Sequence, residues 1–127
     1  MKYIITNKAF NIIKAMYSQA SALSYEAKRL LPEAKEDYRK AKEFWDNADF
    51  ALAEFHRPVH AFDYINELKT KAKSLRERAE KLKVGLNKLT WIPKEVIKEG
   101  KTFNFLEAEV TQKQYYWVMD MYKIYNI

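Results

Sequence analysis

A regular spacing of apolar residues between positions 61 and 89 restricts the fold more than any other feature of the sequence. Successive apolar residues there are separated alternately by four and three positions, and Lys, Glu and Arg fill many positions between them. Such spacing keeps one apolar stripe on one side of a helix, as in a coiled coil. We therefore predict a helix over residues 59–85, ended by Gly85. Its stripe consists of Ala61, Ile65, Leu68, Ala72, Leu75, Ala79, Leu82, Leu86 and Leu89.

The same spacing runs upstream from Phe55 to Phe10, although Pro32 lies within it. Proline removes one backbone hydrogen bond and disfavours helix at the preceding residue. Leu31 has no capping side chain, however, and the apolar phase continues across the proline. We expect one helix over residues 7–56, kinked near Pro32. A connection as short as residues 56–59 makes its two flanking helices antiparallel neighbours.

The last part of the chain, residues 90–127, has a different pattern. Two short candidate strands, 95–98 and 102–108, flank Gly100, and residues 111–114 form a capping-box sequence. The aromatic run at 115–125 is compatible with helix or strand, and the capping box favours helix. The predicted fold is mainly α in a single domain, 1–127: a long antiparallel coiled-coil helical hairpin with a small C-terminal β-hairpin/helix element.

The first helix carries a second apolar column beside its stripe, so its apolar face is wider than a two-helix hairpin can bury. Either the C-terminal segment or a second copy of the protein must cover this column, and we expect both to contribute. A homo-oligomer is therefore predicted. Its expected interface residues are Met16, Leu23, Leu30, Phe44, Tyr122 and Tyr125.

The sequence offers little catalytic chemistry. It has two glycines, fifteen residues apart, and no cysteine, which excludes a Gly-rich phosphate loop, a thiolate nucleophile and Cys-based zinc sites. His56, His60 and Asp63 form only a weak candidate for a metal site or an acid–base pair. Pro58 lies between the two histidines and prevents them from sharing one face of a regular helix. Glu107 and Glu109 occupy alternate positions of a candidate strand, so both carboxylates lie on one face. A solvated strand face explains them more simply than a pair of catalytic carboxylates. We expect no enzyme, cofactor or metal.

Five cations flank the apolar stripe of the 59–85 helix. The corresponding flanks of residues 34–55 in the first helix offer only two acidic residues, Asp37 and Asp49. Three interpretations remain open: a solvated surface that covers the stripe with aliphatic stems, an acidic protein partner, or the phosphates of a nucleic acid. The candidate binding residues are Lys69, Lys71, Arg76, Arg78 and Lys83.

The chain has no apolar run near the roughly 20 residues of a membrane span, and its N-terminus lacks the apolar core of a secretory signal. We therefore expect a cytoplasmic protein without membrane contact.

The segment Trp91-Ile92-Pro93-Lys94, followed by Val96-Ile97 and Gly100, resembles a short W-[I/L]-P-K segment of small uncharacterised phage-encoded proteins. Glu95 stands where that segment usually has serine. The resemblance implies a phage or mobile-element accessory protein, a class whose members often bind and block host machinery. The leading hypothesis is thus a non-enzymatic, oligomeric protein that binds a host protein or nucleoprotein complex. The alternatives are direct nucleic-acid binding and sequestration of a small anionic ligand between subunits.

Overall fold

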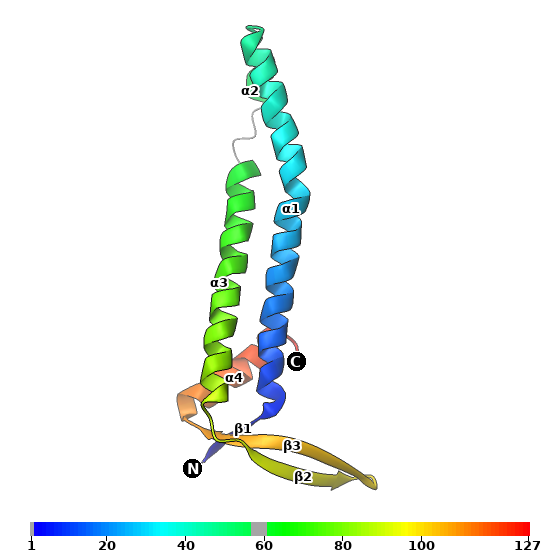
Figure 1. The fold of residues 1–127 in the computed structure, drawn as a ribbon, viewed down its shortest axis with the longest axis vertical. Helices are drawn as coiled ribbons and strands as arrows, with labels where there is room; N and C mark the ends of the chain where they lie inside the picture. The colour runs from blue at the N-terminus through cyan, green and yellow to red at the C-terminus, as the bar shows by residue number, and fades with distance from the viewer. Residues whose placement is uncertain (1, 57–60) are drawn as a thin grey trace. The chain divides into compact units, whose positions relative to one another are not determined.

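The computed structural model describes residues 2–56 and 61–127, with the side chains of Phe55 and His56 left aside. The chain is mainly helical, with a small three-stranded antiparallel sheet (Figure 1). By its internal contacts it divides into unit 1, Met1–Ser18 with Arg76–Ile127, and unit 2, Gln19–Leu75. In chain order the elements are β1 (Tyr3–Thr6), η1 (Asn7–Ala9), α1 (Phe10–Asp46), α2 (Phe50–His56), α3 (Ala61–Asn87), β2 (Ile92–Lys98), β3 (Lys101–Val110) and α4 (Gln112–Ile124).

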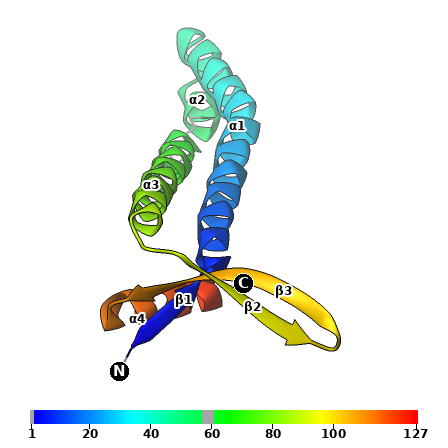
Figure 2. The ribbon, with the colours of Figure 1, turned by 60° about the horizontal axis from the view of Figure 1, so that its bottom comes forward.

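The sheet of unit 1 has the strand order β1-β3-β2 (Figure 2). β2 and β3 form the predicted hairpin, and both turn residues, Glu99 and Gly100, have positive φ angles of 54° and 74°. Such angles characterise the tight two-residue turns whose twist matches that of the strands. Pro93 is tolerated because β2 is an edge strand, where a missing N–H does no harm. β1 was not predicted; it pairs with the end of β3, where Tyr3 lies opposite Val110.

The core of unit 1 is built from segments that lie far apart in the sequence. Ile5 of β1, Ile12 and Met16 of α1, Leu86 of α3 and Val118 of α4 belong to one buried cluster. The C-terminal segment therefore covers the start of the second apolar column of α1, which is one of the two coverings expected from the sequence.

The predicted capping box starts α4. The Thr111 side chain accepts a hydrogen bond from the Gln114 backbone N–H, and the Gln114 side chain accepts one from the Thr111 N–H at 2.8 Å. Two otherwise unpaired backbone donors are satisfied at once. The helical interpretation of the aromatic run is confirmed as far as Ile124.

In unit 2, α3 lies beside α1, and their apolar stripes meet. Ala27 and Ala34 of α1 share a buried cluster with Ile65 and Leu68 of α3. Nearer the start of α3, the rings of Tyr38 and Phe62 are 6.5 Å apart. The stripe predicted for the 59–85 helix is confirmed in this unit.

The predicted stripe of the first helix is not buried beyond Ala34. Tyr38 is 58% exposed and Trp45 is 63% exposed. The physical reason is that α3, the helix packed against α1, begins only at Ala61 and does not reach the later turns of α1. Tyr38 already lies against Phe62 at the start of α3. Farther along α1, Trp45 contacts Phe50 of the short α2, with ring centroids 4.7 Å apart.

The prediction of one helix over residues 7–56 is wrong at residues 47–49. α1 continues through Pro32 but ends at Asp46. The N–H of Asp49 donates to the carbonyl of Phe44 and that of Ala48 to Trp45, while Ala48 has a φ of 61°. This is the Schellman arrangement of a helix end. The Asp49 carboxylate then accepts from the Leu52 N–H at 3.4 Å and caps α2, whereas the expected turn at residues 57–59 lies outside the described residues.

Replacing Ala48 by Gly is expected to raise the free energy of unfolding by about 1 kcal/mol, because the left-handed conformation penalises a Cβ atom. Urea unfolding followed by far-ultraviolet circular dichroism measures the change. Ala22→Gly, at an exposed site within the same helix, is the matched control and should lower the same quantity by about 1 kcal/mol. Two changes of the same sign would contradict the assigned role of Ala48.

The end of α3 also differs from the prediction. Gly85 lies inside the helix, which continues to Asn87. The indole Nε1–H of Trp91 donates to the carbonyl oxygen of Leu86 at 2.8 Å and so satisfies one of the free carbonyls of the helix end. Among the described residues, no helix has the length and apolarity needed to cross a bilayer.

Candidate binding site

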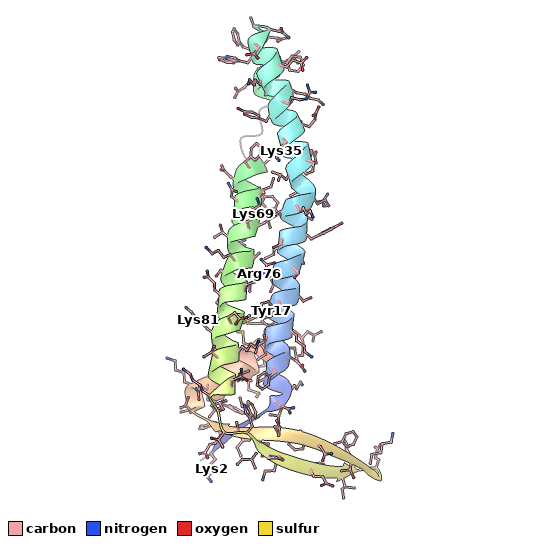
Figure 3. The ribbon with its side chains drawn as sticks, in the orientation of Figure 1. Lys2, Tyr17, Lys35, Lys69, Arg76 and Lys81 are labelled. Carbon is pink, nitrogen blue, oxygen red and sulfur yellow. The ribbon has the colours of Figure 1, made fainter. Side chains whose placement is uncertain are left out.

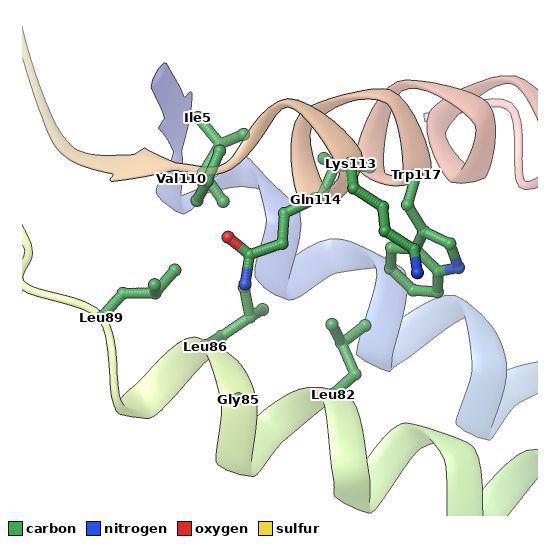
Figure 4. A pocket seen from close by; sticks show the side chains of 10 residues that line it. Ile5, Leu82, Gly85, Leu86, Leu89, Val110, Lys113, Gln114 and Trp117 are labelled. Atoms are coloured by element: carbon green, nitrogen blue, oxygen red, sulfur yellow. The ribbon is translucent and has the colours of Figure 1, made fainter. Parts of the chain in front are cut away.

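An apolar pocket of about 250 Å³ lies within unit 1 (Figure 4). Four elements line it: β1, the last turns of α3 with the residue that follows, the end of β3, and the first turns of α4. The lining residues are Ile5, Leu82, Gly85, Leu86, Leu89, Val110, Lys113, Gln114, Trp117 and Val118.

Local sequence features explain the walls. Leu82 and Leu86 belong to the heptad stripe and therefore lie on the side of α3 that faces the core of unit 1. Gly85 lies between them, and a Cβ added there would meet nothing within 4 Å. On the opposite wall the capping box fixes the start of α4 and the position of Gln114.

Trp117 and Lys113 combine an apolar and a charged surface at this site. Trp117 is 37% exposed, and the Lys113 side chain lies beside its indole in Figure 4. A half-exposed tryptophan beside an apolar hollow is typical of residues that dominate binding energy at protein interfaces.

A second hollow, of about 340 Å³, adjoins the first because both are lined by Leu82 and Trp117. Its other lining residues are Met16, Arg78 and Lys81. The indole of Trp117 is therefore shared by an apolar hollow and a hollow with two cations.

Glu80, one of two acidic residues beside these cations on α3, is engaged within the chain. Glu80 accepts a hydrogen bond from the hydroxyl of Tyr17, which links α1 to α3 in unit 1. This hydrogen bond, with a contribution from burial, raises the pKa of the Tyr17 hydroxyl above its ordinary value.

Positive charge is concentrated in unit 1. Its residues include thirteen Lys and Arg against seven Asp and Glu, whereas unit 2 has ten of each. The formal net charge of +6 therefore resides wholly in the unit that contains the pocket. Such an excess favours negatively charged partners.

The five cations predicted as binding residues are all exposed on α3, and Figure 3 labels Lys69 and Arg76 among them. They divide between the units, with Lys69 and Lys71 in unit 2 and Arg76, Arg78 and Lys83 in unit 1. Lys71 forms an ion pair with Glu67 of its own helix at 3.0 Å. Arg78 is the member of this set that lines a hollow.

The residues predicted for an oligomer interface have mixed environments. Met16 is fully buried within the chain. Leu23 and Leu30 are half-buried against the core of unit 2, and Tyr122 and Tyr125 are half-buried against that of unit 1. Phe44 is half-buried as well.

The structure describes only part of the catalytic and metal candidates. The side chain of His56, and His60 as a whole, lie outside the described residues, and Asp63 is exposed. No group of three or more potential metal ligands occurs within residues 2–56 and 61–127. Glu107 and Glu109 share one face of β3, as expected for alternate residues of a strand.

Sequence reasoning missed most of this site. Of the residues that line the two hollows, it named Arg78 as a binding residue and Met16 as an interface residue, but not Trp117, Lys113, Lys81 or Gly85. We expected Gly85 at a helix end. The capping box at Thr111 supplied a usable signal, since it sets the helical phase that places residues 113, 114 and 117 on one side of α4.

No family model, curated protein or solved structure matches the chain in comparisons with known proteins.

Proposed function

We propose that the protein is a non-catalytic binding protein that captures an acidic segment of a target protein at unit 1. The observation that carries the proposal is the apolar pocket beside Trp117 with Lys113, Arg78 and Lys81 around it. An apolar side chain of the target would fill the pocket, and carboxylates flanking that side chain would meet the cations. Binding energy in such sites comes mainly from the buried anchor, and the charges add specificity and speed association.

The experiment uses fluorescently labelled acidic peptides, each with a single Leu, Phe or Trp anchor. Peptides with the anchor replaced by Ala, or with the acids replaced by their amides, are the reference set. Anisotropy titrations with the full chain should show tighter binding for peptides that have both features. A reference peptide that binds equally well would contradict the proposal.

Two variants test the assigned residues. Gly85→Leu places a side chain at the pocket wall and is expected to weaken binding about tenfold, or ~1.4 kcal/mol. Gly85→Ala is its control, since it improves helix propensity while adding little volume. Arg78→Glu with Lys81→Glu should weaken binding similarly, whereas Lys14→Glu, an exposed change on α1, should leave it unchanged.

A second proposal concerns the way the two long helices pair. We infer that α1 and α3 pair as an antiparallel coiled coil, with a kink in α1 near Pro32. The burial of Ile65, Leu68 and Ala72 at heptad spacing supports this arrangement. We also propose that the protein is a cytoplasmic accessory protein of a phage or mobile element. This proposal is based on the resemblance of the segment that begins at Trp91 to a segment of phage-encoded proteins.

Nucleic-acid binding is the second candidate function. It is favoured by the net positive charge of unit 1 and by the exposed β2–β3 hairpin with Lys94, Lys98 and Lys101, because a two-stranded ribbon fits the major groove of DNA. Titration of labelled duplex DNA and single-stranded RNA at two salt concentrations separates the two functions. Nucleic-acid affinity that falls steeply with salt but persists at physiological ionic strength would favour this candidate.

A further inference from the structure

The β2–β3 hairpin of unit 1 has an unpaired edge on each side over much of its length. β2 pairs with β3 alone, and β1 reaches β3 only at residues 107–110. All seven residues of β2 are exposed. Figure 2 shows the hairpin extending past β1. A two-stranded hairpin is marginally stable by itself in water, so this ribbon would gain from a partner.

One face of the ribbon carries four apolar side chains along its centre, together with Lys94, which lies opposite Phe105. Residues directly opposite each other in an antiparallel pair share a face, and the register places Val96 opposite Phe103. Both are about half exposed, at 46% and 51%, and Ile92 on the same face is 53% exposed. The complete apolar set on this face is Ile4, Ile92, Val96, Phe103 and Phe105.

Charges of opposite sign occupy the two ends of this same face. Lys98 and Lys101 lie opposite each other beside the turn. At the other end, Glu107 lies opposite Ile92 and Glu109 lies opposite Ile4. The two ends are about 20 Å apart at about 3.3 Å per residue. The opposite face of the sheet is used within the chain, where Ala108 and Val110 are buried.

We propose that this face binds a second copy of the chain in a two-fold dimer. A two-fold axis through the middle of the apolar set would place the turn lysines of each copy against the carboxylates of the other. Such isologous contacts require a self-complementary surface. This face has a largely apolar centre that also contains Lys94, with two lysines at one end and two glutamates at the other. A nucleic acid or an anionic membrane would be attracted to the lysine end of this face but repelled by Glu107 and Glu109 at the other end, whereas a second copy matches both ends.

The proposed dimer assigns the self-association expected from the sequence to this face of the sheet. It is independent of the proposal that the pocket binds an acidic peptide. The peptide titration and the mass measurement described below can therefore fail independently.

The test measures the molar mass of the full chain by light scattering and sedimentation across a range of protein concentrations. The unmodified chain should form a dimer that is weakened by salt. Lys98→Glu with Lys101→Glu makes both ends of the face negative, and Glu107→Lys with Glu109→Lys makes both positive. Each pair of changes should weaken dimerisation on the order of a hundredfold, because like charges then oppose each other.

Charge exchange supplies the decisive control. An equimolar mixture of the two double variants should form a heterodimer, and a chain with all four changes should dimerise again. Lys123→Glu, an exposed change on α4, should have no effect. Val96→Ser with Phe103→Ser should abolish the dimer while circular dichroism stays unchanged. A monomer at all concentrations, or a dimer insensitive to these changes, would overturn the proposal.

Discussion

Replacing Trp91 by Ala is expected to lower the free energy of unfolding by about 3–5 kcal/mol, the range for removing a large aromatic side chain from a packed site. The indole ring lies 5.5 Å from the ring of Phe10, centroid to centroid, and packs against the core of unit 1. Its N–H also satisfies the carbonyl of Leu86 at the end of α3. Ala would leave a cavity and an unpaired carbonyl together.

Guanidinium unfolding followed by circular dichroism measures this effect, and two companion variants divide it into parts. Trp91→Phe keeps most of the ring but loses the hydrogen bond, so the expected loss is about 1 kcal/mol. Ile97 lies six residues later, in β2, and its side chain is 72% exposed. Ile97→Ala should therefore change the free energy of unfolding by less than about 0.5 kcal/mol. If Trp91→Ala were as mild as Ile97→Ala, the anchoring role of Trp91 would be wrong.

The second large effect is expected at Met16. Met16 is 0% exposed and belongs to the cluster formed by α1, α3, β1 and α4 of unit 1. Met16→Ala should lower the free energy of unfolding by about 2–5 kcal/mol. Because these contacts lie within one chain, the loss should not depend on protein concentration.

Unfolding at two protein concentrations, at least tenfold apart, tests this assignment. Met16→Leu conserves volume and should cost less than about 1.5 kcal/mol, while Ser18→Ala, at an exposed position two residues later, should have little effect. A Met16→Ala variant with unchanged unfolding but weaker self-association would place Met16 at an interface between copies, as the width of the apolar face first indicated.

The candidate site was only partly predictable. The cations of α3 were recognisable because heptad spacing defines the positions that flank the stripe. The pocket itself was not, because its walls come from β1, α3, β3 and α4, and the sequence does not reveal which of these elements meet. Trp117 illustrates the difficulty. Its helical phase could be read from the capping box, but its exposure depends on what packs beside it.

Features that depend on neighbouring residues were determined by the sequence alone. The stripe of α3, the capping box of α4 and the hairpin turn at Gly100 all arise from hydrogen bonds or side-chain directions within a few residues. The break at residues 47–49 is local as well, but the apolar phase that continues across it concealed the helix end at Ala48.

Only the tertiary structure decided the pairing of β1 with β3 and the burial of Met16 by the C-terminal segment. Tyr3 and Val110 lie opposite each other although more than a hundred residues separate them. The strand β1 has four residues, too few for an alternating apolar pattern to be recognised in the sequence. Its stability comes from the surface it buries after the chain has closed on itself, and that free energy belongs to the whole fold rather than to any local segment.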